Sequence, residues 1–394
     1  MKGKIKNLRK AAQRILKAIK NEERIILYGD ADLDGIGSVI ILKETIEKLR
    51  GKISAFYFPK REKEGYGITE ESLSVLKKNA PALFIALDCG ISNFKEVKKA
   101  NKLGFEVIIV DHHQVLDKLP EASIIIDPKQ ETDKYPFKEM ACVGVAYKLA
   151  EAVFMEDKEN YPKNKRFLKE FLEIVALGTI ADQVPLICEN EKFVKEGLRT
   201  LNYTSRPGLQ VLIELTGFKD GGLQEVQQKI TSRLKSSENQ GNLNEIFIFL
   251  TEKSLAKTEK MALDFIKESR RKKDQADEIY SEVEKKVKDS DIFVFQGSKE
   301  WPLISLGGVA SRICHKFKKP VFLYRIQGKE NQGTVRNPGD INGVEAMIHC
   351  KELLETYGGH AKASGFRIKN KNLKKFKKRL SEYFRKQINS KEND

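Results

Sequence analysis

The sequence has few cysteines and no long apolar run. Five cysteines are scattered over 394 residues without C-x-x-C spacing: Cys89, Cys142, Cys188, Cys314 and Cys350. This pattern argues against a disulfide framework or a zinc ribbon and favours a reducing compartment. No segment approaches about 18 consecutive apolar residues, and the basic N-terminus lacks the apolar core of a signal peptide. These absences predict a cytoplasmic protein without a membrane partner.

Acidic residues are in the minority. Asp and Glu number 56 against 72 Lys and Arg, which gives a formal net charge of +16. An excess of this size favours a polyanionic partner, with nucleic acid first and an anionic membrane second. A soluble lysine-rich protein without such a partner has the same composition, so the charge alone does not separate these interpretations.

The first half of the chain alternates short apolar strands with helices. Such a pattern indicates a parallel α/β sheet. Strands are predicted at 24–29, 53–58, 82–87, 106–110 and 123–126. Helices are predicted at 5–20, 39–49, 69–78, 93–103, 140–155, 166–181, 190–202, 207–216 and 222–234.

A chain of this length exceeds one ordinary hydrophobic core, so two or three domains are expected. The charged run 254–289 has too few apolar positions for burial all round and predicts a connecting helix. A smaller α/β domain follows it, with strands at 291–296, 320–326 and before Arg336, and helices at 309–317, 343–355 and 371–387. We therefore predict a catalytic domain over 1–252, the connecting helix over 253–289 and a substrate-binding domain over 290–394.

An acidic stretch, Asp30-Ala31-Asp32-Leu33-Asp34-Gly35, directly follows the first predicted strand. If the chain stays extended there, the three carboxylates lie on one face and require raised pKa values or a multivalent cation. The same letters begin an EF-hand calcium loop, but the twelfth position is Ile41 rather than Glu and a strand precedes it. A solvated turn in which Asp34 caps the next helix is the plainer alternative.

Acid or imidazole side chains follow four of the predicted strands. Ligands of parallel α/β sheets bind outside the carboxyl ends of the strands, so these side chains are candidate ligands of one site. They are Asp30, Asp32 and Asp34, then Asp88, then Asp111, His112 and His113, then Asp127. Asp182, at the end of an apolar helical run, is a further candidate.

Aspartate and histidine with little thiolate suit Mn²⁺ or Mg²⁺. The candidates exceed what one ion needs, and two ions roughly 3.5–4 Å apart, bridged by a carboxylate, hydrolyse phosphate esters. Asp88, alone at the end of its strand, is the expected bridge. Of the adjacent His112 and His113, we expect one to bind metal and the other to contact the phosphate or tune the nucleophilic water.

Cations and glycines supply candidates for phosphate binding. Glycine lets backbone N–H groups approach a phosphate, and Lys, Arg or His adds charge. We expect one domain to hold metals and the other phosphates, with the substrate in the cleft between them. The candidates are Arg61, Arg312, Arg336, Gly358, Gly359, His360, Lys362, Ser364 and Gly365.

Together these motifs resemble those of the DHH phosphoesterase family. The matching motifs follow the family's order: Asp30-x-Asp32-x-Asp34-Gly35, Asp88-Cys89-Gly90, Asp111-His112-His113 and Gly178-Thr179-Ile180-Ala181-Asp182. The glycine-rich residues 358–365 look like the signature of the family's companion DHHA1 domain. Within the family, the likeness is to the RecJ subfamily of single-strand-specific exonucleases, in a short, archaeal-type form without a C-terminal OB-fold.

The resemblance implies roles for the motif residues. The implied metal ligands are Asp32, Asp34, Asp88, His112 and Asp182, while His113 acts at the phosphate beside Asp111, and His360 and Arg336 hold substrate. Tyr28 stands where related enzymes often have histidine, so the first metal either uses Asp30 or has an incomplete shell.

The leading hypothesis is a two-metal exonuclease, with Mn²⁺ or Mg²⁺, that acts on an end of single-stranded DNA or RNA in repair or replication and has replication or repair proteins as partners. Two alternatives stay open. One is a DHH phosphoesterase for short oligonucleotides, cyclic dinucleotides or phosphoadenosine phosphate. The other is an inactive RecJ-like factor that only binds nucleic acid.

Overall fold

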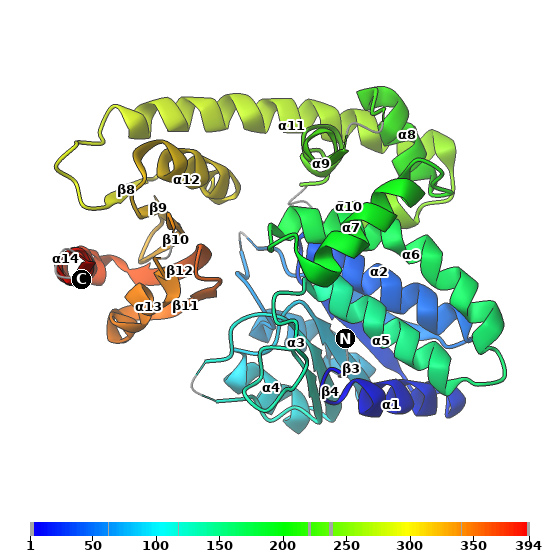
Figure 1. Cartoon of the computed structure of the whole chain (residues 1–394). Helices are drawn as coiled ribbons and strands as arrows, with labels where there is room; N and C mark the ends of the chain where they lie inside the picture. The colour runs from blue at the N-terminus through cyan, green and yellow to red at the C-terminus, as the bar shows by residue number, and fades with distance from the viewer. Residues whose placement is uncertain are drawn as a thin grey trace. The chain divides into compact units, whose positions relative to one another are not determined.

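The computed structural model describes residues 4–61, 63–116, 118–219, 222–235, 239–339 and 341–391. The chain divides into two compact units, Met1–Lys267 and Glu268–Asp394 (Figure 1). The long helix α11 (Leu255–Glu284) contains the boundary between them. Each unit has its own sheet and its own hydrophobic cores.

The first unit is built on a five-stranded sheet in the order β2-β1-β3-β4-β5, in which neighbouring strands pair in parallel. Apolar side chains, many of them β-branched, fill four of the strands because helices cover both faces of the sheet. The predicted α/β class is thereby confirmed. The strands are β1 (Ile25–Gly29), β2 (Ile53–Tyr57), β3 (Ala82–Leu87), β4 (Phe105–Val110) and β5 (Ile124–Ile126).

Two groups of helices cover this sheet. Helices α3 and α4 pack on one face, and α1, α2, α5 and α6 pack on the other. A short hairpin of β6 (Asn239–Gln240) and β7 (Leu243–Asn244) forms a two-stranded sheet of its own and hydrogen-bonds to the backbone of Phe58, just after β2. The helices of the unit are α1 (Leu8–Lys20), α2 (Leu33–Lys48), α3 (Glu70–Leu76), α4 (Phe94–Lys102), α5 (Cys142–Glu156), α6 (Tyr161–Asp182), α7 (Cys188–Leu201), α8 (Pro207–Thr216), α9 (Gly222–Val226) and α10 (Glu245–Thr251), with a 3₁₀ turn η1 (Lys77–Asn79) and a π-helical turn η2 (Gln227–Thr231).

The acidic stretch after β1 is not extended throughout, so the condition under which its three carboxylates would share one strand face is not met; a helix cap is present instead, formed by Asp32 rather than Asp34. Helix α2 begins at Leu33, and Asp32 is its N-cap: Asp32 Oδ1 accepts hydrogen bonds from the backbone N–H of Asp34 at 3.1 Å and of Gly35 at 3.0 Å. A side-chain oxygen that satisfies the first N–H groups of a helix is a strong start signal. Gly35 is required there, because a Cβ would lie 2.5 Å from the Asp30 carbonyl oxygen.

Other differences from the predicted elements concern glycines and short segments. Helix α12 (Leu303–Phe317) begins before the predicted 309 and runs through Gly307 and Gly308. The Arg336 guanidinium lies against Gly307, where a Cβ would be 3.0 Å from Arg336 Nη2. The predicted helix 343–355 ends at Ile348 and gives way to strand β11. Helix α10 and the β6–β7 hairpin were not predicted.

The second unit has a mixed five-stranded sheet in the order β11-β12-β10-β9-β8. Strands β8 and β9 pair in parallel, and the other pairs are antiparallel. This agrees with the predicted smaller α/β domain. The strands are β8 (Val294–Ser298), β9 (Val321–Ile326), β10 (Glu330–Arg336), β11 (Leu354–Gly359) and β12 (Ala363–Lys369).

Helices lie on both faces of the second sheet. Helices α13 (Gly343–Ile348) and α14 (Leu373–Lys391) share a core with Phe322 and Phe366. Helix α12 and the C-terminal part of α11 share a second core with Val321 and Leu323. Because Val321, Phe322 and Leu323 are consecutive in β9, the two cores lie on opposite faces of the sheet. Two 3₁₀ turns, η3 (Lys351–Leu353) and η4 (Asn370–Asn372), complete the unit.

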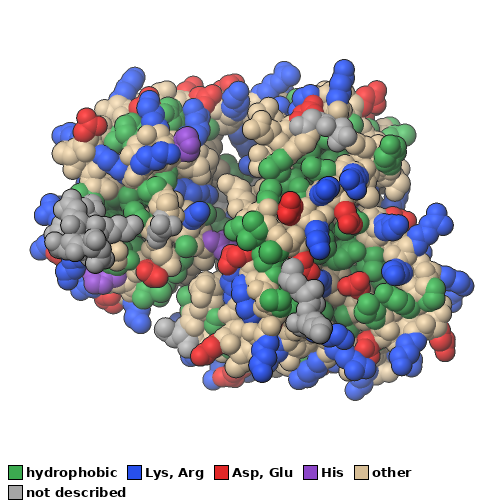
Figure 2. Space-filling model, viewed as in Figure 1, with side chains coloured by type: hydrophobic (Ala, Val, Ile, Leu, Met, Phe, Trp, Pro, Cys, Tyr) green, Lys and Arg blue, Asp and Glu red, His purple; other side chains and the backbone are tan. Residues whose placement is uncertain are grey.

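Many of the side chains at the surface are charged. Lys and Arg are spread widely over the face shown in Figure 2. Among the described residues, no helix combines the length and the apolar character needed to cross a membrane.

Candidate metal centre

The candidate residues meet at the carboxyl edge of the first sheet. In the strand order 2-1-3-4-5, the chain reverses its direction of winding between β1 and β3, where parallel α/β sheets bind ligands. The hydrogen-bond ladder continues one residue past these strands. Asp30 N donates to Leu87 O at 3.1 Å, and Asp88 N donates to Val110 O at 2.9 Å. The ladder therefore fixes the spacing of Asp30 and Asp88 at about one strand separation, ~4.8 Å.

Asp88 lies at the centre of this edge. Potential ligand atoms lie within 4.8 Å of one another in three sets that share it: Asp34–Asp88–His112, Asp30–Asp32–Asp88 and Asp88–Asp111–His113. Its Oδ1 lies 3.2 Å from His112 Nε2 and accepts no hydrogen bond within the described residues. Asp88 has a positive φ of 62°, which a non-glycine residue rarely adopts. Such backbone strain concentrates at functional sites.

Asp34 is held by the start of another helix. Its two carboxylate oxygens accept hydrogen bonds from the backbone N–H of Cys142 at 2.9 Å and of Val143 at 2.7 Å, at the N-terminus of α5. Asp34 Oδ2 also lies 3.5 Å from His112 Nε2. A helix N-terminus favours a negative charge, so α5 both orients Asp34 and offsets part of its charge.

Asp182 reaches the same imidazole from the end of α6. Its Oδ2 lies 3.7 Å from His112 Nε2 and, among the described residues, accepts no hydrogen bond. A carboxylate at a helix C-terminus faces the negative end of the helix dipole, where a cation is favoured. Burial, followed by the charge of Asp32, raises the pKa of Asp182 to about 6.

The crowded carboxyl groups resist ionisation in the metal-free protein. Burial, then the charges of Asp34 and Asp32, raises the pKa of Asp88 well above its ordinary value. Burial, then Asp182 and Asp32, does the same for the pKa of Asp34. Like charges this close cannot all be ionised without a counter-charge. The arrangement therefore fits a site for multivalent cations, with carboxylate and imidazole donors of the kind that Mn²⁺ accepts.

His113 is positioned by Asp111 rather than by the group around His112. Asp111 Oδ1 lies 2.7 Å from His113 Nδ1, and the same carboxylate accepts backbone hydrogen bonds from His112 and Ile91. Burial alone would lower the pKa of His113, but Asp111 outweighs it and raises the pKa to about 9. His113 is therefore protonated at neutral pH. Asp111 acts on the site through the orientation and charge of His113.

Asp30 and Arg61 form a bidentate ion pair. Arg61 Nε donates to Asp30 Oδ1 at 3.1 Å, and Arg61 Nη2 donates to Asp30 Oδ2 at 2.6 Å. Arg61 Nη2 also donates to Asp32 Oδ2 at 2.9 Å. Burial would raise the pKa of Asp32, yet the Arg61 charge and the Gly35 N–H lower it. Both oxygens of Asp30 are thus engaged by Arg61, and Arg61 lies at the rim of the cluster.

Two further residues near this edge have different surroundings. Asp127, after β5, is fully buried and belongs to none of the three sets around Asp88. Its burial, and next the negative charge of Asp111, raise the pKa of Asp127 to about 7. Tyr28 donates its hydroxyl to Gly67 O at 2.8 Å and stacks on Tyr57, in the core beneath α3 and α4. Tyr28 therefore lies away from the candidate ligands.

In the second unit, the predicted cations have protein partners. Arg336 Nε donates to Ser311 Oγ at 3.1 Å and Arg336 Nη1 to Thr334 Oγ1 at 2.9 Å. Arg312 pairs with Asp277 and lies over the Tyr280 ring, 4.2 Å from its centroid. Arg336 thus reaches α12 from the end of β10, and Arg312 packs α12 onto α11.

The glycine-rich segment 358–365 is mostly strand, with a short turn between β11 and β12. Gly358 and Gly365 face each other in the antiparallel pair of β11 and β12. The chain reverses between His360 and Ala363, whose backbone groups bond each other at 2.8 and 3.1 Å. Gly359, with φ 123°, pairs with the buried Ser364, and Lys362 is exposed on the turn.

Sequence reasoning missed the backbone donors of the site. The N–H groups of Cys142 and Val143 hold Asp34, and no side chain marks them as functional. It also missed the pairing of Arg61 with Asp30, since 31 residues separate the two. The only available signal was a predicted helix start near 140.

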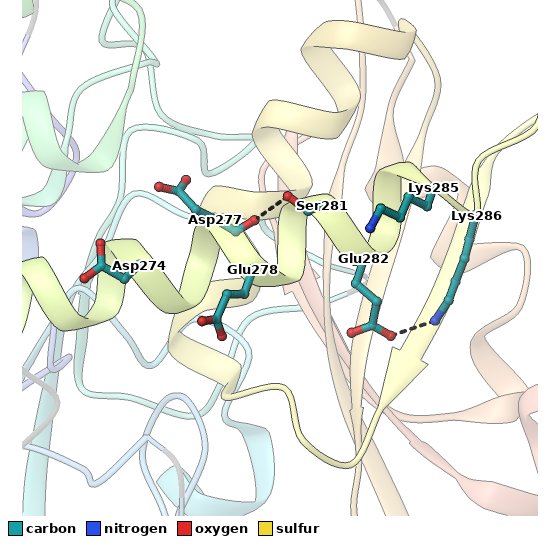
Figure 3. A pocket seen from close by; sticks show the side chains of 7 residues that line it. All are labelled: Asp274, Asp277, Glu278, Ser281, Glu282, Lys285 and Lys286. Carbon is teal, nitrogen blue, oxygen red and sulfur yellow. Dashed lines mark hydrogen bonds and ion pairs between the residues drawn. The ribbon is translucent and has the colours of Figure 1, made fainter.

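A hollow beside α11 is distinct from this cluster (Figure 3). Part of its acidic lining is compensated, since Glu282 pairs with Lys286 at 2.6 Å and accepts a hydrogen bond from Trp301. It contains none of the predicted site residues. Its lining residues are Asp274, Asp277, Glu278, Ser281, Glu282, Lys285 and Lys286.

Comparison with known proteins identifies relatives for both units. A model of the DHH family N-terminal domain matches residues 24–179, and a DHHA1 domain model matches residues 267–386. The chain is 34% identical over 389 residues to the single-stranded-DNA-specific exonuclease RecJ of Bacillus subtilis, an alignment that covers 96% of this chain and 48% of that protein. The chain spans about half the length of the curated relatives it matches first.

Solved structures give the same picture. A crystal structure of exonuclease RecJ bound to manganese matches with a TM-score of 0.78 and 29% identity, covering 97% of this chain and 95% of that one. RecJ of Thermus thermophilus in complex with Mn²⁺ matches with a TM-score of 0.82 and 28% identity, covering 97% of this chain and 55% of that one.

Proposed function

The chain belongs to the DHH family, and on that premise we propose that it is a metal-dependent exonuclease that hydrolyses phosphodiester bonds at an end of single-stranded DNA or RNA. The observation that carries the proposal is the convergence of Asp34, Asp88 and Asp182 on His112, with two buried carboxylate oxygens that accept no hydrogen bond within the described residues. The relatives named above act on single-stranded DNA, so DNA is the first substrate to test and RNA the second.

We assign two divalent ions, Mn²⁺ or Mg²⁺, to the cluster around Asp88. The ligand set is Asp32, Asp34, Asp88, His112 and Asp182, with Asp88 as the bridge because it is common to the three ligand sets. Asp30 was predicted as a ligand as well, but its engagement by Arg61 favours a role in holding that arginine. Bound ions of this kind activate a water for attack on phosphorus and stabilise the leaving oxygen.

The protein's own cations complete the proposed chemistry. Protonated His113, oriented by Asp111, places a positive charge where a phosphate gains negative charge in the transition state. We assign Arg61 to the same phosphate. Arg61 pairs with both Asp30 and Asp32, and a cation bound by Asp32 would displace Arg61 from the Asp32 carboxylate, which leaves part of the guanidinium available. His113 and Arg61 would thus bind and orient the phosphate while the carboxylates hold the ions.

We assign to the second unit the binding of the rest of the nucleic-acid strand, beyond the phosphate that is cleaved. Arg336 and Arg312 come from β10 and α12, and the rest of the set comes from the β11–β12 turn and its flanking glycines. We retain the division into a catalytic domain over 1–252, a connecting helix over 253–289 and a substrate-binding domain over 290–394. A cytoplasmic role in DNA repair or replication, with protein partners from those processes, fits this activity. The assigned residues are Arg312, Arg336, Gly358, Gly359, His360, Lys362, Ser364 and Gly365.

Substrate length separates this proposal from the two alternatives. With Mn²⁺ present, we expect a 30-nucleotide single strand, labelled at either end, to be shortened from one end, with strong inhibition by salt. Preference for a dinucleotide, without salt inhibition, would instead identify a phosphoesterase for short substrates. Binding of the 30-mer without any Mn²⁺-dependent cleavage would identify an inactive binding factor and overturn the proposal.

Stability of the metal-free protein should fall as the pH rises from 5.5 to 8. The folded-state pKa of Asp182 is raised to about 6, and those of Asp34 and Asp88 are raised well above their ordinary value. A carboxyl group whose pKa is raised on folding contributes its full stabilisation below the unfolded pKa of about 4. This stabilisation is lost as the pH rises through the pKa of the folded state. His113 acts in the same direction, since its contribution is lost as the pH passes about 9.

Thermal unfolding at several pH values measures this effect. We expect the Tm of the metal-free protein to fall by roughly 5 °C over this range, and Mn²⁺ to raise the Tm more at pH 8 than at pH 5.5. The lowered pKa of Asp32 and Asp111 changes stability only below about pH 4, outside the range. A Tm that rises with pH in the metal-free protein would contradict the assigned crowding of carboxylates.

A further inference from the structure

The positive charge of the chain is distributed unevenly. The unit Glu268–Asp394 has 28 Lys and Arg against 17 Asp and Glu, so it holds 11 of the 16 net positive charges. Within it, residues 371–387 have eight Lys and Arg and one acid, Glu382. The charge excess that first indicated a polyanionic partner is therefore concentrated on and just before α14.

Helix α14 presents its cations to solvent on one side. Phe376, Leu380 and Phe384 are fully buried in the core that α14 shares with the second sheet. At the helical period, the opposite side of α14 is a row of exposed cations with one exposed acid, Glu382, among them. We call this row, with the lysine that precedes the helix, the basic stripe: Lys371, Lys374, Lys375, Lys378, Arg385 and Lys386.

The charges of the basic stripe are not compensated within the protein. None of its six residues forms an ion pair or a side-chain hydrogen bond in the part of the chain that the structure describes. By contrast, cations of α11 and α12 pair with acids, as Arg312 does with Asp277 and Lys316 with Glu284. Like charges three or four residues apart destabilise a helix by about 0.2–0.5 kcal/mol per pair. A bound polyanion would remove this repulsion.

The basic stripe lies on a different face of the unit from the predicted substrate contacts. Val335 packs in the core under α14, whereas the next residue of β10, Arg336, reaches Ser311 of α12 on the other face of the sheet. Successive side chains of a strand point to opposite faces. The stripe is therefore a separate surface from that of Arg336.

We propose that the basic stripe of α14 binds the phosphate backbone of a nucleic-acid strand outside the catalytic centre. This inference rests on the proposed function. From Lys374 to Arg385 the helix advances about 16 Å at 1.5 Å per residue, a length that spans several successive phosphates. All six side chains of the stripe are Lys or Arg, which contact phosphate oxygens without reading the base sequence. A membrane surface fits less well, because the apolar side chains described in α14, from Leu373 to Phe384, pack in the core and are not available to enter a bilayer.

A triple variant with a matched control tests the stripe. The test variant carries Lys374→Gln, Lys375→Gln and Lys378→Gln. The control carries Lys95→Gln, Lys98→Gln and Lys102→Gln on α4, three exposed lysines of the first unit that form no ion pair within the described residues. Glutamine keeps helix propensity close to that of lysine, so both variants should fold and both lose three charges.

Binding of a 30-nucleotide single strand in EDTA, measured over a range of salt concentrations, is the readout. In the test variant, we expect the slope of log affinity against log salt to shrink by about 2, since each phosphate contact on a single strand contributes about 0.7. We expect the Kd at low salt to rise roughly tenfold. The control should behave like the parent, and hydrolysis of a dinucleotide with Mn²⁺ should be unchanged in all three proteins.

The outcomes separate the stripe from the proposed function. If the parent binds the 30-mer and the test variant binds it equally well, or if the control loses as much affinity as the test variant, the stripe is overturned and the exonuclease proposal stands. If the parent binds no 30-mer, or binds phosphatidylserine vesicles in its place, the stripe is overturned as well. If the parent binds the 30-mer but does not cleave it with Mn²⁺, while the test variant alone loses affinity, the exonuclease proposal is overturned and the stripe stands.

Discussion

Replacing Asp88 by asparagine should abolish Mn²⁺-dependent hydrolysis, with kcat lower by at least about 10³-fold, or roughly 4 kcal/mol of transition-state stabilisation. Asp88 is common to the three ligand sets at the carboxyl edge of the sheet, and its Oδ1 is a buried acceptor beside His112 Nε2. Asparagine keeps the shape and tolerates a left-handed backbone of φ 62°. The change therefore removes the charge that would bridge two cations and leaves the fold in place.

Stability and a neighbouring acid supply the controls for Asp88→Asn. Because burial and like charges raise the pKa of Asp88, the variant should be at least as stable as the parent without metal. Asp127→Asn, at the same edge but in none of the ligand sets, should keep activity within about tenfold of the parent. Parent-like hydrolysis by Asp88→Asn would refute the assigned bridge.

Replacing His113 by alanine should lower kcat by about 10²–10³-fold, because the phosphate loses a positive charge while the metal ligands stay in place. Asp111 holds His113 Nδ1 at 2.7 Å and raises its pKa to about 9, so His113 brings a positive charge to the phosphate at neutral pH. The imidazole is not in the set we assign to the ions. The variant should therefore bind as much Mn²⁺ as the parent while its catalysis is weak.

The pH dependence of kcat distinguishes this role from a structural one. In the parent loaded with its ions, kcat should decline at alkaline pH as His113 loses its proton. The decline should lie at or below the pKa of about 9 that Asp111 gives His113 in the metal-free protein, because nearby cations disfavour the protonated imidazole. In Asp111→Asn, which removes the charge that raises the pKa of His113, the decline should move to a lower pH. If His113→Ala retains parent-like kcat, or if its Mn²⁺ binding is lost, His113 does not act at the phosphate as assigned.

The sequence predicted the sheet and most of the candidate cluster for one physical reason. Parallel strands end at a common edge, so residues that directly follow several buried strands must lie near each other, as Asp30, Asp88 and Asp111 do. It misplaced the start of α2, because Asp32 stabilises the helix through its own side chain and the period-2 interpretation ignored that cap. The core of the fold was thus predictable from apolar patterns, and its ends were less so.

The remaining features of the site depend on contacts that no pattern encodes. The α5 N-terminus holds Asp34 through backbone N–H groups. Arg61, which follows β2, pairs with Asp30, which follows β1. Tyr28, where related enzymes often have histidine, packs in the core beneath α3 and α4, in agreement with the expectation that it supplies no metal ligand. Likewise, glycines 358 and 365 face each other within strands because their lack of side chains suits close strand pairing as well as a turn.

Counting bound metal tests the central claim most directly. Equilibrium dialysis of the metal-free protein against Mn²⁺ should give two ions per chain for the parent and for His113→Ala, and one or none for Asp88→Asn. Two ions bound by Asp88→Asn with parent-like affinity, or none bound by the parent, would contradict a dimetal centre held by this edge of the sheet.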